Sequence, residues 1–157
     1  DLAVSLYPCG GSSSLTLAFE AAESINQFCL HTGKQVVIFY IGDHDPAGVL
    51  IDQSLESELR RHLDASVRME FARLAITPEQ IARYELPAKP RKASDKRAQH
   101  VAESVQAEAM PAKLMRQLLR DRVEALLPPD ALRVTKAAEK SEREGLRLLA
   151  ASMRGRS

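Results

Sequence analysis

The chain has few aromatic residues and no long hydrophobic segment. Of its 157 residues none is tryptophan, three are tyrosine and four are phenylalanine. This scarcity argues against a protein that binds single-stranded nucleic acid by stacking bases on aromatic side chains. The longest uninterrupted apolar run has six residues, Val36–Ile41, whereas a membrane-spanning helix needs about 20. No apolar segment with basic flanks opens the sequence, so we expect neither a signal peptide nor a membrane partner.

Cysteine is scarce as well. Cys9 and Cys29 could form at most one disulfide, and neither lies in a Cys-x-x-Cys or Cys/His metal-ligand spacing. We expect both thiols to be buried and reduced, as in a cytoplasmic protein. The first residue is Asp1 and not methionine, so we expect a processed chain or part of a longer protein.

A net charge of +1 hides two halves of opposite sign. Residues 1–64 contain three Lys and Arg against nine Asp and Glu, whereas residues 65–157 contain 19 against 12, giving net charges of −6 and +7. An acidic and a basic half in one chain suggest a cation site beside a surface for polyanions. The alternative is that the basic residues are solvated on long helices.

Hydrophobic periodicity predicts alternating strands and helices. Strands are expected at residues 2–7, 35–41, 67–76 and 105–110, and helices at residues 15–32, from 49 onward, 77–84, 112–127 and 130–153. The uninterrupted apolarity of residues 35–41 predicts a central strand buried on both faces. The alternation as a whole predicts an α/β fold with a parallel sheet flanked by helices and a C-terminal helical tail.

An acidic turn, Gly42-Asp43-His44-Asp45-Pro46-Ala47-Gly48, follows the strand at residues 35–41. In parallel sheets, functional groups gather at the carboxyl ends of strands. Residues two apart project to the same side of an extended backbone, about 6–7 Å from each other. At an effective dielectric near 20, two carboxylates at that distance repel by roughly 2–3 kcal/mol. A bound cation would offset this repulsion, and oxygen ligands favour Mg²⁺.

Pro46 and Gly48 are the structural residues of this turn, one rigid and one permissive. A metal beside the start of the next helix, which attracts anions, suits phosphoryl chemistry. Alternatively, Asp43 and Asp45 only cap that helix. His44 is expected to face solvent and not to bind a metal.

The segment Val36–Gly48, VVIFYIGDHDPAG, resembles the DxDxxG motif of the Toprim domain, a fold shared by topoisomerases, bacterial primases and several nucleases. The DPxG form is most similar to the topoisomerase VI A subunit and to uncharacterised bacterial Toprim proteins. Residues 7–15, 74–80 and 86–95 carry weaker similarity to the same proteins. The resemblance implies a Toprim-like domain lacking its first strand at residues 1–110, followed by a C-terminal helical segment at residues 111–157.

By this resemblance, Asp43 and Asp45 are catalytic residues that hold Mg²⁺ for making or breaking phosphodiester bonds in DNA. Toprim enzymes also use a glutamate at the end of the first strand, and no glutamate precedes Glu20 here. We expect a preceding segment or a partner subunit to supply it, so that these 157 residues alone do not cleave DNA. Glu20 and Glu108 are disfavoured as substitutes because they fall in an expected helix and an expected strand.

Five bases lie within nine residues, Lys89, Arg91, Lys92, Lys96 and Arg97. They are candidate contacts to DNA phosphates, or else an exposed linker. The family's nucleophilic tyrosine has no counterpart, and Tyr7, Tyr40 and Tyr84 are expected to be packing residues.

Two other functions stay open. One is a catalytically degenerate Toprim scaffold or DNA-binding module. The other is a haloacid-dehalogenase-like phosphatase, which also places D-x-D after a buried strand but carries Thr or Val where this chain has Ala47.

Overall fold

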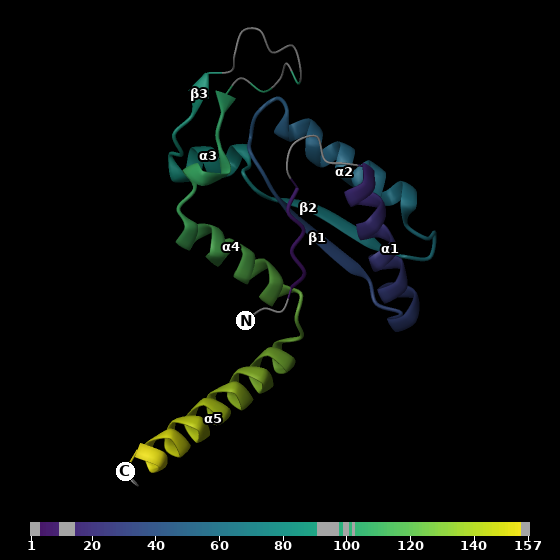
Figure 1. Cartoon of the computed structure of the whole chain (residues 1–157). Helices are drawn as coiled ribbons and strands as arrows, with labels where there is room; N and C mark the ends of the chain where they lie inside the picture. Colours follow the sequence, from purple (N-terminus) through teal and green to yellow (C-terminus); the bar gives the residue numbers. More distant parts are fainter. Residues whose placement is uncertain (1–3, 10–14, 91–97, 99–100, 102, 155–157) are drawn as a thin grey trace. The chain divides into compact units, whose positions relative to one another are not determined.

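The protein is an α/β structure. The computed structural model describes residues 4–9, 15–90, 98, 101 and 103–154. They divide into two compact units, one within residues 3–116 and one within residues 117–157. The elements are α1 Leu15–Thr32, β1 Val36–Ile41, α2 Gly48–His62, β2 Met69–Ala75, α3 Pro78–Tyr84, β3 Lys89–Pro90, β4 Glu103–Ser104, a 3₁₀ helix Ala107–Ala109, α4 Ala112–Ala125 and α5 Pro129–Arg154 (Figure 1).

Strands β1 and β2 pair in parallel, as the strand–helix–strand pattern predicts, with α2 as the connection between them. Their register runs from Val36 opposite Met69 to Tyr40 opposite Arg73, with an irregularity after Tyr40. The pairing continues past the end of β1, because the Gly42 N–H donates to the Ala75 carbonyl at 2.8 Å and the Ile76 N–H donates to the Gly42 carbonyl at 2.9 Å. The first residue of the acidic turn is therefore still fixed by the sheet.

Helices α1 and α2 pack against the same face of this sheet (Figure 1). Their buried residues are Ala18, Ala21, Ala22, Leu55 and Leu59, and the sheet residues that pack on them include Ile38, Tyr40, Met69 and Phe71. These strand positions alternate, so they lie on one side of the pleat. The small alanine side chains of α1 leave room for the larger residues of the strands.

The prediction that β1 is buried on both faces is wrong. Its residues are half-buried, and Ile41 is 39% exposed. Within the described ranges, β1 has β2 as its only strand neighbour, and the two helices cover one face. A continuous apolar run therefore does not require a central strand here.

Two further strand predictions are also wrong. Residues 4–9 form no strand, and Leu6 is 89% exposed; residues 2 and 3 lie outside the described part. In the 105–110 segment, only Val105 pairs, through a single antiparallel bridge to His44, and a 3₁₀ helix follows. Conversely, the short strand β3 lies where the sequence predicts no strand, and it pairs antiparallel with β4.

Local signals place the helix ends well. Gly33 follows α1 with φ +67°, the left-handed conformation that glycine adopts easily. At the start of α3, the Thr77 hydroxyl accepts the Gln80 N–H at 3.3 Å and the Gln80 side chain accepts the Thr77 N–H at 3.1 Å. Gln80 also donates to the Leu74 carbonyl at 2.8 Å, so this capping box fixes α3 to the end of β2.

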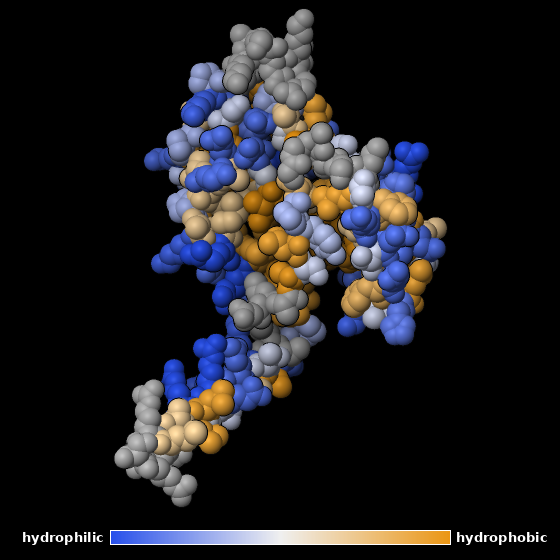
Figure 2. Space-filling view, viewed as in Figure 1, coloured by the Kyte–Doolittle hydropathy of each residue, from blue (hydrophilic) through white to orange (hydrophobic). Residues whose placement is uncertain are grey.

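The C-terminal unit, residues 117–157, is helical in its described part. The chain leaves the helical path between Ala125 and Pro129, and Lys136 of α5 forms an ion pair of 3.0 Å with Glu124 of α4. Several large apolar side chains of α5 are exposed: Val134, Leu146, Leu148, Leu149 and Met153 (Figure 2). Among the described helices, none has the length and hydropathy of a membrane span. The expected domain boundary after residue 110 falls shortly before α4, and the two units divide within α4, after residue 116.

The two cysteines differ in environment. Cys29 is buried in α1, whereas Cys9 is exposed, so the prediction of two buried thiols is wrong for Cys9. Tyr7 is 49% exposed and likewise does not pack as expected. The cause is the same for both, since residues 4–9 form no strand. Partial burial of its thiol nevertheless raises the pKa of Cys9.

We expect a thiol reagent such as Ellman's reagent to modify one cysteine per native chain rapidly. The Cys9→Ser variant should lose this fast phase, and the Cys29→Ser variant should keep it. Because the Cys9 pKa is raised, the fast phase should still accelerate between pH 8 and pH 9.5. Equal rates for both thiols would contradict the structure.

Candidate functional site

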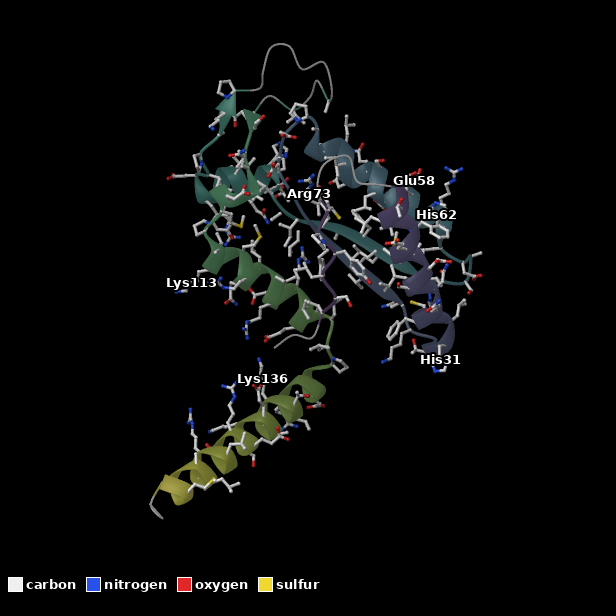
Figure 3. The ribbon with its side chains drawn as sticks, in the orientation of Figure 1. His31, Glu58, His62, Arg73, Lys113 and Lys136 are labelled. Carbon is white, nitrogen blue, oxygen red and sulfur yellow. The ribbon has the colours of Figure 1, made fainter. Side chains whose placement is uncertain are left out.

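Arg73, near the carboxyl end of β2, holds the backbone of the acidic turn (Figure 3). Its Nη1 donates to the carbonyl oxygens of Gly42, Asp43 and Ile76 at 3.2, 3.1 and 3.3 Å. Its Nη2 donates to the Gly48 carbonyl at 2.8 Å. One guanidinium thus joins both ends of the turn to β2. The planar five-donor fork of arginine suits this task, which a lysine could not perform.

A partly buried ion pair anchors this arginine to α2. The Arg73 Nε donates to the Asp52 Oδ2 at 2.6 Å, and the two side chains are only 15% and 13% exposed. The guanidinium carbon also lies 5.1 Å from the centre of the Tyr40 ring, a cation–π contact. Burial is the main cause that raises the pKa of Tyr40, and the nearby Arg73 charge acts in the opposite direction. Tyr40 is therefore a packing residue, as predicted.

Asp43 and Asp45 each bond one backbone N–H. The Asp43 Oδ1 accepts the Ala107 N–H at 2.7 Å, and the Asp45 Oδ1 accepts the Gly48 N–H at 2.5 Å. Arg73 binds the carbonyl of Asp43 and not its carboxylate. Among the described residues, no hydrogen bond reaches the second oxygen of either carboxylate. Each side chain is thus oriented by the backbone through one of its two oxygens.

The capping alternative holds in part: the Asp45 side chain bonds the N–H of Gly48, the first residue of α2, whereas the Asp43 side chain bonds Ala107 instead. The Asp45 carbonyl accepts the Val49 N–H at 3.0 Å. The N–H groups of Gly48 and Val49, at the start of α2, are therefore already hydrogen-bonded to Asp45. This weakens the expected ability of the helix start to attract phosphate.

Gly48 lies where only glycine fits. A Cβ atom at this position would overlap the carbonyl oxygen of Asp43. The turn is closed so tightly that residues 43 and 48 meet backbone to backbone, and Pro46 between them is buried. The expected structural roles of Pro46 and Gly48 agree with this geometry.

His44 does not face solvent as expected. It is half-buried, and its backbone exchanges hydrogen bonds with Val105 at 2.8 and 2.9 Å. His44 lines a cavity to which neither Asp43 nor Asp45 contributes. His44 thus differs from the two aspartates beside it, as alternation along the turn predicts. It is nevertheless half-buried, because its backbone pairs with Val105.

Within the described part of the chain, no group of three or more His, Cys, Asp or Glu residues could hold a metal ion. Glu20 is exposed on α1, and Glu108 is exposed on the 3₁₀ helix, next to the Ala107 that binds Asp43. In the basic cluster, Lys89 is exposed on β3. Arg91, Lys92, Lys96 and Arg97 lie outside the described residues.

Sequence reasoning missed Arg73 and Asp52. The available signal was a basic residue inside an otherwise apolar stretch, Phe71-Ala72-Arg73-Leu74-Ala75. An arginine at that position has a buried side chain that must find acceptors.

Comparison of the chain with protein-family models found no match, and comparisons with curated proteins and with solved structures found none either.

We expect Arg73→Gln to lower the free energy of unfolding by about 3–5 kcal/mol, since it leaves Asp52 and several carbonyls without their donor. The matched control is Arg60→Gln, which removes an exposed pair with Glu56 whose side chains are 51% and 36% exposed. That change should cost less than about 1 kcal/mol. Urea unfolding measures both, and similar losses would contradict the central role of Arg73.

Gly48→Ala should destabilise the residues 3–116 unit by about 1–3 kcal/mol, because the new methyl group meets backbone that cannot move aside. Gly145→Ala is the control, since a Cβ there meets open space on α5. It should stabilise the helix by roughly 0.5–1 kcal/mol. Circular dichroism during urea unfolding follows both variants; a tolerated Gly48→Ala would show that the turn is not closed as described.

Proposed function

We propose that the acidic turn is the Mg²⁺ site of a Toprim-like module that acts on phosphodiester bonds in DNA. The observation that supports this most directly is the state of the two carboxylates. Asp43 and Asp45 follow the carboxyl end of β1, each with one oxygen fixed by a backbone N–H and one oxygen left for a ligand. The resemblance of residues 36–48 to the DxDxxG motif supplies the reaction class.

The residues present fit a magnesium ion. Mg²⁺ binds through one or two carboxylates and retains several water molecules. Carboxylate ligands are themselves held by hydrogen bonds, as Ala107 and Gly48 hold these two. Arg73 supplies positive charge beside the turn. It does not bond the carboxylates of Asp43 and Asp45, because its donors bond backbone carbonyls and the Asp52 carboxylate.

When bound, Mg²⁺ would neutralise negative charge that develops on a scissile phosphate. The chain's own contribution is placement: Asp43 and Asp45 bind the ion, and Arg73 positions their backbone. A Toprim site also uses a glutamate, and in this proposal a partner subunit or further polypeptide supplies it. The 157 residues alone are then expected to bind Mg²⁺ but not to cleave DNA.

The test is a Mg²⁺ titration of the chain by two-dimensional NMR. The amides of Ala107 and Gly48 donate to the two carboxylates and should shift saturably. Asp43→Asn and Asp45→Asn should each weaken binding about tenfold or more, equivalent to about 1.4 kcal/mol. Asp64→Asn, which removes the same charge from an exposed aspartate bonded to Ser66, should leave the affinity unchanged.

The other functions give different results in the same experiment. An absence of saturable shifts, or binding that Asp43→Asn and Asp45→Asn leave intact, would favour a catalytically degenerate scaffold. A stable beryllofluoride adduct on Asp43 would favour the phosphatase alternative, in which Asp43 is the nucleophile.

A further inference from the structure

Helix α5 exposes several large apolar side chains. Val134, Leu146, Leu148 and Met153 are all more than 60% exposed (Figure 2). The helix has 26 residues, which corresponds to a length of about 39 Å. Helices in proteins gain most of their stability by packing an apolar side against other structure. An apolar side of this length therefore calls for a partner surface.

One side of α5 follows a seven-residue repeat. Val134, Ala138, Ser141, Gly145 and Leu148 are spaced by four, three, four and three residues. This is the spacing of the two contact positions in a coiled coil. A strict repeat of this kind keeps the same side of a helix against a neighbouring helix over several turns. The partner that fits this side is thus another helix.

The far side of α5 is charged. Its exposed bases are Arg133, Lys136, Lys140, Arg143 and Arg147. At 3.6 residues per turn, their mean direction lies about 140° from that of the seven-residue repeat. Three of these bases already pair with carboxylates, as Arg143 does with Glu139 at 2.7 Å. Mixed charges of this kind are typical of the solvent side of paired helices.

Carboxylates border the repeat on both edges. Glu142 lies at one edge and Glu144 at the other, about 80° from the middle of the repeat. A lipid surface would have to accept these two negative charges beside its apolar contact, whereas interfacial helices carry mainly Lys and Arg there. A protein helix is the better fit.

The repeat is complementary to a second copy of itself that runs in the opposite direction. Val134 then lies opposite Gly145 of the second copy, and a Cβ atom at Gly145 would meet only open space, so the valine side chain has room. Glu144 comes within about 3 Å of Arg133 of the second copy along the helix axis, on the same flank, and the two charges are opposite. In a parallel pair, Val134 and Gly145 would each meet their own copy, and the glycines would leave a gap.

We propose that two copies of this chain associate through an antiparallel pair of α5 helices. The contact side is the seven-residue repeat from Val134 to Leu148. Each copy contributes the same surface, so the contact closes with two-fold symmetry and ends at a dimer. The association involves neither Asp43 nor Asp45 and does not depend on the proposed function.

The first test is analytical ultracentrifugation of the full chain over a concentration series, which should show a monomer–dimer equilibrium. Leu148→Glu should raise the dimer dissociation constant at least tenfold, because it places a charge in the contact. Leu146→Glu is the matched control, since Leu146 is 68% and Leu148 72% exposed and only Leu148 belongs to the repeat. Circular dichroism should show both variants folded. Equal effects of the two substitutions, or none from Leu148→Glu, would refute the interface.

The second test measures direction by disulfide cross-linking in a Cys9→Ser background. The variant with both Val134→Cys and Gly145→Cys should form dimers linked by disulfides under mild oxidation. Neither single variant should do so, because identical positions then lie about 16 Å apart along the axis, beyond the reach of a disulfide. Disulfide-linked dimers of a single variant, or none of the double variant, would contradict the antiparallel register.

A chain that stays monomeric throughout the concentration series would overturn the proposal. Co-sedimentation with vesicles of phosphatidylserine and phosphatidylcholine, lost in Leu148→Glu, would then identify a lipid surface as the occupant of this side of α5. Because the acidic turn takes no part in the contact, the Mg²⁺ titration should give the same result for Leu148→Glu as for the unchanged chain.

Discussion

A single guanidinium group holds the acidic turn against the end of β2 and against α2. Arg73 joins the end of β2 to the acidic turn through backbone carbonyls and to α2 through Asp52. Because its partners in the turn are main-chain atoms, the path of the chain is held while the carboxylates of Asp43 and Asp45 stay available. The partly buried pair with Asp52 is tolerated because the charges are close and Arg73 has further acceptors, which compensates for removing both from water.

Most helices and the two main strands could be predicted from sequence because their signals are local. Thr77 and Gln80 carry the capping box within four residues, and Gly33 stops α1 by its own conformational freedom. The failures arise where distant residues decide. Val105 is buried by tertiary contacts and bonds one residue of the acidic turn, so its apolar character indicated burial correctly and a strand incorrectly.

The candidate site was predictable in part for the same reason. Asp43 and Asp45 are close in sequence and follow an obvious strand, so their place in the turn after β1 could be inferred, whereas their separate partners, Ala107 and Gly48, could not. Arg73 lies 30 residues from Asp43, whose carbonyl it binds, and no spacing rule connects a strand arginine to the carbonyls of a remote turn. Asp52 appears in sequence as an ordinary polar position of an amphipathic helix. Its burial becomes evident only in the folded structure, where Arg73 of β2 lies beside it.

The hydrogen bond between Asp43 and Ala107 joins two residues whose numbers differ by 64. Ala107 opens the short 3₁₀ helix that ends only a few residues before α4, the helix in which the two units divide. The Asp43 carboxylate therefore fixes the start of the 3₁₀ helix to the acidic turn. Loss of the Asp43 side chain would therefore leave the Ala107 N–H without its acceptor.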